Sequence, residues 1–451
     1  MGKNLSMLAV KISHTRVLTT LVATLVTLLF VSTNASAGPR GLNQGAFDEL
    51  TESGVFKYLD QFSPVSSEGS GDGWTKHTFD SDDGNGPICI TGTDYSVYSR
   101  EGNSKKLLVF LQGGGACWQG FYNCNFLAED QAPPPVGPYP GVFDASNRDN
   151  PFRDYSVVYM PYCDGSGFGG DNDIADAGWE SATGSPLRYQ RGVRNVSAGM
   201  DVAGKLFPKA KKVTVMGHSA GGVGVAAFAP FLARYVFGNK TQLTVYNDAG
   251  PIAVNLGAEG TTPGQGDAPF FGCIDSAGLL DFSCVSVLFR ANDWQFAKFY
   301  PASCIESGRC NAFGQQTGII DWRLENDVTI REAFYETDSD GTNRFFAQGD
   351  GTLMDPQLYR ELILTEHGAL HDAYPGRYKR FIVSADDTHG AVQTTASSNC
   401  FPEAQPLLFY TQKANGRSLN EWTAAFIKVS RRPTKQGWKD IVEDYVSVED
   451  C

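Results

Sequence analysis

Short apolar runs rich in β-branched residues alternate along the chain with segments of helical spacing. The runs at 106–112, 156–160, 212–216 and 242–247 have the length and composition of buried strands, and 191–206 is typical of a helix. Strands that alternate with helices predict a mostly parallel sheet with right-handed crossovers. We therefore expect an α/β fold.

Glycine-rich loops follow the predicted strands, at 113–153 and 164–185. Ligands bind outside the carboxyl ends of the strands in such a sheet, so we expect the functional site among these loops. Residues 251–312 hold four cysteines and no clear strand, and we interpret them as a cap over the site. The glycines of 165–170 are spaced almost like a dinucleotide fingerprint but lack its strand–turn–helix context, which favours a rim loop for the substrate.

Residues 1–37 are typical of an export signal. Three basic residues precede the apolar run 17–31, and Ala35-Ser36-Ala37 supplies a small-residue cleavage site. The apolar run is short for a membrane span. We therefore expect a secreted or periplasmic protein without a stable membrane anchor, in which residues 38–451 form a single domain.

All ten cysteines follow the predicted signal. An even number in an oxidising compartment predicts a disulfide framework, and the wide spacings offer no Cys-x-x-Cys metal knuckle. Cys117–Cys124 and Cys304–Cys310 are the local pairs that we expect first, and Cys451 indicates that the C-terminal tail is tied down. The remaining connectivity stays open.

The net charge of −13 becomes more negative when the leader is removed, because the leader carries basic residues and no acidic ones. An acidic surface argues against nucleic acid and anionic membranes as partners. It also disfavours attraction of a polyanionic substrate, although salt weakens that effect. We expect a monomer.

Residues 213–222 read Val-Thr-Val-Met-Gly-His-Ser-Ala-Gly-Gly, a strand-like run that ends in Gly-x-Ser-x-Gly and continues into a small-residue helical stretch. This is the pattern of a nucleophile elbow, in which Gly217 and Gly221 leave room for Ser219 in a strained, exposed position. The alternative is a loop serine in a glycine-rich chain. We predict Ser219 as the nucleophile.

A second motif lies upstream, where the apolar run 106–112 ends in three glycines. Backbone N–H groups approach a tetrahedral oxyanion most closely where no Cβ intervenes, and esterases of the α/β-hydrolase type place a donor at this point. We predict an oxyanion hole formed by the N–H groups of Ala220 and of Gly114 or Gly115. The alternative is a flexible glycine turn.

The motifs around Ser219 resemble the pectin acetylesterase/Notum family. The resemblance covers about residues 86–255 and is carried by Leu111-Gln-Gly-Gly-Gly-Ala-Cys-Trp118, by 155–171 with its Tyr-Cys-Asp-Gly stretch, by Arg191-Gly-Val-Arg194 and by the elbow. It implies an α/β-hydrolase fold, a Ser-Asp-His triad and carboxylesterase activity on acylated glycans or acylated protein.

The sequence departs from the family pattern at two places. Ala116 stands where the family carries a tryptophan, and the indole follows at Trp118, so we expect a differently shaped acyl pocket. His218 stands where relatives carry a small residue or a cysteine, so a family disulfide through that position is absent.

The general base must follow Ser219 in the chain order of this fold, which leaves His367, His371 and His389 of the six histidines. His389 follows the apolar run 380–384 and lies in a polar loop, as a catalytic histidine does, and we predict it as the base. His367 and His371 are spaced i, i+4 on a predicted helix. They form a metal pair in one interpretation, but solvated or capping positions are more common.

The triad acid is expected after a strand, where it can hold the imidazole tautomer. Asp321 follows 313–320 and occupies the place that the resemblance implies for the acid, so we predict Asp321 in this role. Asp327 and Asp350 are the alternatives. Other aspartates receive structural roles: Asp248 closes a turn, and Asp386 and Asp387 shape the loop of His389.

Together these features predict a serine carboxylesterase that removes acyl groups, with acetyl as the first choice, from O-acylated polysaccharide or a related ester through an acyl-enzyme. No cofactor or metal is expected. A lipase, polyester depolymerase or secreted protease would share the triad. A non-catalytic extracellular glycan-binding protein is the alternative outside the enzymes.

Overall fold

The computed structural model describes residues 41–126, 141–250, 282–310, 316–348, 351–392, 408–428 and 437–447, with the backbone alone for 282–287. The predicted signal segment, residues 251–281 of the predicted cap, Asp350 and Cys451 lie outside the described residues. The role of 251–312 as a cap therefore stays a prediction.

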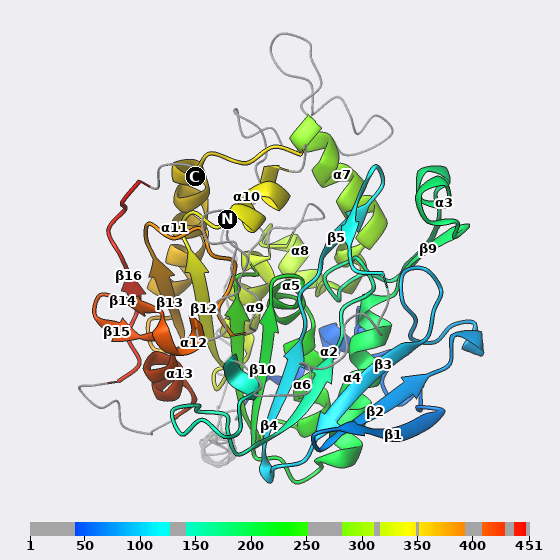
Figure 1. The fold of residues 1–451 in the computed structure, drawn as a ribbon, viewed down its shortest axis with the longest axis horizontal. Helices are drawn as coiled ribbons and strands as arrows, with labels where there is room; N and C mark the ends of the chain where they lie inside the picture. Colours follow the sequence, from blue (N-terminus) through cyan, green and yellow to red (C-terminus); the bar gives the residue numbers. More distant parts are fainter. Residues whose placement is uncertain are drawn as a thin grey trace, which may run out of the picture. The chain divides into compact units, whose positions relative to one another are not determined.

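A ten-stranded sheet forms the centre of the unit that begins at Arg40 (Figure 1). Neighbouring strands are antiparallel from β1 to β7 and parallel from β7 to β16, which confirms the predicted mostly parallel sheet. In spatial order the strands are β1 (Ser66–Gly71), β2 (Trp74–Phe79), β3 (Tyr95–Arg100), β7 (Tyr155–Met160), β4 (Asn103–Leu111), β10 (Lys212–His218), β11 (Gln242–Asp248), β12 (Arg331–Thr337), β13 (Tyr378–Val383) and β16 (Ile441–Val442).

The strand order reverses next to β4. The chain passes from β4 to β7 on one side of it and returns through helix α4 (Gly192–Leu206) to β10 on the other side. If the main-sheet strands from β2 to β13 are numbered 1 to 8 along the chain, their order across the sheet is 1-2-4-3-5-6-7-8. The Gly-x-Ser-x-Gly motif lies at the end of the fifth of these strands, β10. This is the topology of an α/β-hydrolase, as predicted, and the reversal places a crevice at the carboxyl ends of β4 and β10.

Alternate residues of each central strand face opposite sides of the sheet. In β4, Val109 and Leu111 belong to one hydrophobic cluster, and Leu108 and Phe110 belong to the other. Because both faces are covered, the central strands are apolar throughout rather than alternating with polar residues. This explains why the apolar runs are visible in the sequence.

Helices cover both faces of the sheet. Residues of α4 and of helix 229–237 pack in the first cluster, and residues of helix 419–427 pack in the second. The remaining helices are α2 (Gln44–Glu52), α3 (Ala177–Thr183), α5 (Ala220–Ala226), α6 (Ala229–Phe237), α7 (Phe282–Trp294), α8 (Ala302–Glu306), α9 (Thr317–Asn326), α10 (Gly341–Gln348), α11 (Pro356–Ala373), α12 (Leu408–Thr411) and α13 (Leu419–Ile427). Among these described helices, none alone has the length and apolar composition to cross a bilayer, whereas the bent pair of α5 and α6 has them when taken together.

Among the described residues, three two-stranded antiparallel sheets lie outside the main sheet: β5 (Gly115–Trp118) with β6 (Phe121–Cys124), β8 (Asn172–Ala175) with β9 (Leu187–Gln190), and β14 (Lys413–Ala414) with β15 (Arg417–Ser418). The predicted disulfides Cys117–Cys124 and Cys304–Cys310 are both present. A third, Cys89–Cys163, joins positions 74 residues apart. The first of these crosslinks closes the β5–β6 hairpin, which begins at a predicted oxyanion residue.

Candidate active site

Ser219 lies at a sharp turn between β10 and α5. Its backbone has φ 53° and ψ −121°, a conformation that is strained for any residue with a Cβ. A Cβ on Gly217 would lie 2.0 Å from the carbonyl oxygen of Gly221, and a Cβ on Gly221 would lie 2.0 Å from that of Leu111. Both glycines are therefore required for the turn, and Ser219 occupies the elbow position that the motif predicts.

The predicted oxyanion residues lie beside Ser219. A Cβ on Gly113 would come within 2.7 Å of the Ser219 Cβ, so the end of β4 packs directly against the elbow. Gly115 has φ 76° and lines the same cavity as Ser219 and Ala220, whereas Gly114 lines the adjoining cleft. The structure thus brings these residues together, and their role as donors is part of the proposal below.

His389 lies in the loop after β13 and is paired with Asp340. Its Nδ1 is 2.7 Å from Oδ2 of Asp340, and the Asp340 side chain is completely buried. Oδ1 of Asp340 accepts the backbone N–H of Asn343, which fixes the carboxylate at the start of α10. Nε2 of His389 is buried and has no hydrogen-bond partner among the described residues. The free nitrogen is the one that a general base needs.

The electrostatic surroundings of His389 favour its protonated form. Burial lowers the pKa of this imidazole, but the charge and hydrogen bond of Asp340 and the charge of Asp248 outweigh burial. The pKa of His389 is therefore raised above its ordinary value.

Asp321 is not the partner of His389. It lies in α9, where its Oδ1 accepts the Tyr374 hydroxyl at 2.8 Å and its Oδ2 is 3.3 Å from Nε of Arg309. Residues 317–326 form a helix, so the strand expected to end at Asp321 does not exist. The structure corrects the prediction: the acid at His389 is Asp340.

The position of Asp340 in the sequence fits a triad acid, but the polar residues of the strand before it make that strand difficult to recognise. Asp340 follows β12, at the strand-end position that a triad acid requires, but β12 carries two glutamates and does not resemble a buried strand. Glu332 is neutralised by Arg323, whose Nε and Nη2 donate to it at 2.7 and 2.9 Å. Burial, with the neighbouring charge of Asp340, raises the pKa of Glu336 well above its ordinary value, which favours the neutral form of this side chain.

The alternative bases have structural partners. His367 stacks on Phe334 with ring centroids 3.8 Å apart, and burial together with the charge of Arg380 lowers its pKa to about 3. Nδ1 of His371 donates to the backbone carbonyl of Tyr378 at 3.0 Å. In the described part of the chain, no group of three or more His, Cys, Asp or Glu side chains is placed to hold a metal ion.

The other acids also hold structure together. Asp327 accepts a hydrogen bond from Arg234 at 2.8 Å. Asp386 accepts the backbone N–H of Thr388 and the side-chain amide of Gln412, so it shapes the loop of His389 as predicted.

Asp248 does more than close a turn, because it joins the elbow to the His389 loop. Its backbone carbonyl accepts the N–H of Ser219 at 2.8 Å. Its buried carboxylate accepts Nδ1–H of His218 at 2.7 Å and the backbone N–H groups of Ala391 and Val392 at 3.0 and 3.3 Å. The rings of His218 and His389 lie 5.1 Å apart. One carboxylate therefore fixes the residues on both sides of the site.

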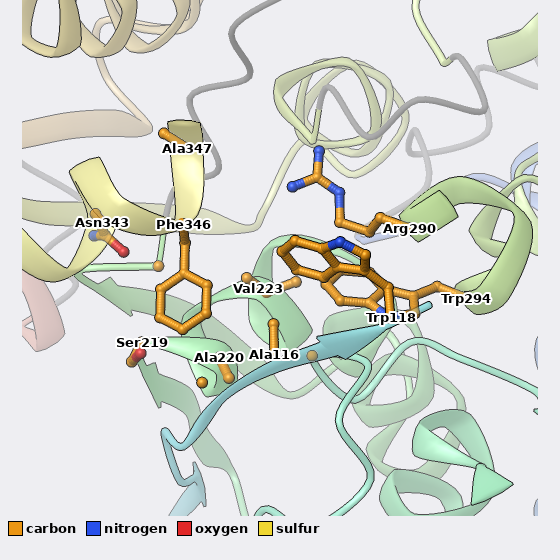
Figure 2. Close-up of a pocket in the computed structure, with 13 residues that line it drawn as sticks. Ala116, Trp118, Ser219, Ala220, Val223, Arg290, Trp294, Asn343, Phe346 and Ala347 are labelled. Carbon is orange, nitrogen blue, oxygen red and sulfur yellow. The ribbon is translucent and has the colours of Figure 1, made fainter. Parts of the chain in front are cut away.

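A small apolar cavity of about 40 Å³ opens at Ser219. Figure 2 shows Phe346 of α10 beside Ser219 and Ala220, with the indoles of Trp118 and Trp294 farther along the cavity. The cavity is also lined by Gly115, Ala116, Gly167, Val223, Gly250, Arg290, Asn343 and Ala347. Of the loop 165–170, which we predicted to border the substrate, Gly167 lies in this lining, and the loop is buried.

A larger cleft of about 470 Å³ adjoins this cavity and shares Gly115 and Phe346 with it. The cleft lies between the β5–β6 hairpin and α10. Its further described lining is mostly polar or aromatic: Gly114, Asn123, Cys124, Asn125, Gly341, Thr342, Phe345, Leu353 and Asp387. The site thus has a small apolar side and a large polar side.

An elbow serine, a buried His–Asp pair and this sheet topology occur together in the α/β-hydrolase fold. Residues 74–260 match the family model for Pectinacetylesterase. This match overlaps most of the region whose motifs resemble the pectin acetylesterase/Notum family.

The curated relatives match over a limited region. The chain is 29% identical over 146 residues to palmitoleoyl-protein carboxylesterase notum1 of Xenopus laevis, covering 30% of this chain and 28% of the relative. It is 28% identical over 155 residues to palmitoleoyl-protein carboxylesterase NOTUM of Schmidtea mediterranea, covering 30% and 27%. The aligned region thus spans less than a third of these relatives. The solved structure of the Wnt deacylase Notum from Drosophila aligns with a TM-score of 0.48 and 17% identity, over 78% of this chain and 94% of that one.

Proposed function

We propose that the protein is a secreted serine carboxylesterase whose triad is Ser219, His389 and Asp340. The observations that carry this proposal are the strained elbow serine and a buried His389 whose Nδ1 is held by Asp340 while Nε2 has no partner among the described residues. The match of residues 74–260 to the Pectinacetylesterase family model supports ester hydrolysis as the reaction.

The reaction follows from these positions. Nε2 of His389 takes the proton of the Ser219 hydroxyl as the oxygen attacks the ester carbonyl. The N–H groups of Ala220 and of Gly114 or Gly115 stabilise the tetrahedral oxyanion, and Asp340 stabilises the imidazolium. The alcohol leaves with the proton from His389. Water then attacks the acyl-enzyme with the same base, which releases the carboxylic acid and restores Ser219.

The small apolar cavity supports a short acyl group. One water needs about 10–15 Å³ on this measure, so a cavity of about 40 Å³ is closer in size to an acetyl group than to a long chain. The two indoles that line it are part of the buried core, with Trp118 2% and Trp294 4% exposed. We therefore propose an acetyl ester as the substrate, unlike the palmitoleoyl ester in the names of the curated relatives.

The polar cleft supports an alcohol with many hydroxyl groups, such as a glycan. Asn123, Asn125 and Thr342 offer side-chain donors and acceptors, and Phe345 offers an aromatic surface for a sugar ring. The disulfides support an oxidising compartment, in agreement with the predicted export signal. The proposal needs no cofactor, nucleic acid or second copy of the chain.

A panel of 4-nitrophenyl esters from acetate to palmitate, run beside acetylated polysaccharides, tests the proposal. We expect the highest kcat/KM for acetate, and a fluorophosphonate label on Ser219 that is lost in Ser219→Ala. A maximum at long chains would identify a lipase or depolymerase instead. Intact folding without labelling or hydrolysis would favour a glycan-binding protein.

A further inference from the structure

The polar cleft differs from a polyanion-binding site in its charge. Of the described residues that line it, none is a lysine or arginine, and one, Asp387, is an acid. Arg290 lines the small apolar cavity rather than the cleft. Arg344 lies in the same helix as Thr342 but is buried, and its Nε donates to the carbonyl of Met354 at 2.6 Å.

Outside the described residues, segments 1–40 and 429–436 contain lysine and arginine, whereas the segments between positions 127 and 407 contain neither. Between positions 127 and 407 these segments are 127–140, 251–281, 311–315, 349–350 and 393–407. They contain no lysine, arginine or histidine, while all but 311–315 contain aspartate or glutamate. None of them can supply a cation to the cleft.

A glycan made of uronic acids carries a carboxylate on each sugar. Proteins bind such groups with arginine or lysine, and the described lining of the cleft offers neither. The cleft instead offers the amides of Asn123 and Asn125, the Thr342 hydroxyl and the ring of Phe345, which suit hydroxyl groups and sugar faces. The net charge of −13 adds a long-range repulsion of polyanions.

We propose that the alcohol side of the site accepts uncharged acetylated glycans and discriminates against acetylated polyuronates. This inference rests on the proposed esterase function and specifies its substrate class. The proposed substrate class therefore differs from the pectin in the name of the family model that residues 74–260 match.

Acetate release from acetylated xylan and from acetylated polygalacturonate of matched acetyl content tests the inference. The salt concentrations are about 0.01 M and about 1 M, where the Debye lengths are about 30 Å and 3 Å. At low salt we expect kcat/KM for the polygalacturonate to be lower by about tenfold or more. At high salt the difference in kcat/KM between the two polysaccharides should become smaller.

A charge added to the cleft provides a second measurement. Asn123 is exposed, so its replacement does not disturb the core. Asn123→Lys should raise the ratio of polygalacturonate to xylan kcat/KM several-fold at low salt, whereas the uncharged control Asn123→Gln should not raise it.

Faster or equal release from polygalacturonate by the wild-type enzyme at low salt would overturn the inference and leave the esterase function intact. Hydrolysis of 4-nitrophenyl acetate without release from either polysaccharide would do the same. A protein that hydrolyses none of these esters and does not react with a fluorophosphonate would overturn both the inference and the proposed function.

Discussion

Oδ2 of Asp340 lies 2.7 Å from Nδ1 of His389, and the Asp340 side chain has no exposed surface. The contact joins the loop after β12 to the loop after β13, two adjacent parallel strands. A buried carboxylate in this position holds one tautomer of the imidazole and stabilises the imidazolium that forms during the reaction. Asp340 is therefore the residue on which the proposed chemistry depends most after Ser219 and His389.

Asp340→Asn should lower kcat by about 10⁴, the loss found when a triad acid is neutralised in serine hydrolases, with little change in KM. Asp321→Asn is the matched control, because Asp321 is an acid on α9 that contacts Tyr374 and Arg309 instead. The control should retain activity within a few-fold. Steady-state hydrolysis of 4-nitrophenyl acetate measures both variants, and the reverse pattern would restore Asp321 as the acid.

The raised pKa of His389 gives a definite sign to the pH dependence. The base must be neutral, so kcat/KM should rise with pH and reach half of its maximum above pH 6.5, the ordinary value for histidine. In Asp340→Asn, burial acts without its main opposing charge, so the remaining activity should have its half-maximum at lower pH. A wild-type half-maximum well below 6.5 would contradict the described surroundings of His389.

The sequence predicts the centre of this fold well because its strands are buried on both faces. The apolar runs around β4, β10 and β11 mark these strands, and the glycines of the elbow mark the turn. The apolar pattern does not point to Asp340 because β12 carries two buried glutamates, one paired with Arg323 and one whose raised pKa favours the neutral form. Such compensation depends on residues brought together by the fold, and a linear pattern does not show it.

A smaller side chain at Trp118 should admit longer acyl groups. Trp118→Ala removes an indole that lines the small cavity, so kcat/KM for 4-nitrophenyl butyrate or hexanoate should rise relative to acetate, at a stability cost of about 3–5 kcal/mol. Phe121→Ala is the control, since Phe121 stacks on Trp118 at 4.2 Å but is not among the described residues that line the cavity. An unchanged chain-length profile in Trp118→Ala would mean that the acyl group binds elsewhere.

The two short disulfides should differ in their effect on catalysis. They close loops of similar length, with sequence separations of 7 and 6, so loss of either should cost about 2 kcal/mol of stability. Cys117–Cys124 closes the hairpin that begins at Gly115, and its replacement by two serines should lower kcat by about 10-fold to 100-fold through a displaced oxyanion donor. The same change at Cys304 and Cys310 should leave kcat near the wild-type value. Equal kcat in both double variants would show that the β5–β6 hairpin does not position an oxyanion donor.

Asp248→Asn should impair both stability and the pH profile, because Asp248 connects the two halves of the site. The amide retains one acceptor oxygen, whereas the carboxylate accepts His218 and the N–H groups of Ala391 and Val392. A buried donor left unpaired costs about 1–3 kcal/mol, so we expect a loss of this size in chemical denaturation.

The charge of Asp248 also contributes to the raised pKa of His389, so the half-maximum of kcat/KM in Asp248→Asn should move to lower pH. The control is Asp386→Asn, which weakens contacts to Thr388 and Gln412 in the same loop. Asp386 does not contribute to the raised pKa of His389, so its variant should lose stability without this pH shift. If both variants lose stability and neither shifts the pH profile, Asp248 acts on the fold alone. A downward shift confined to Asp248→Asn would show that the residue that fixes the elbow also sets the proton affinity of the base.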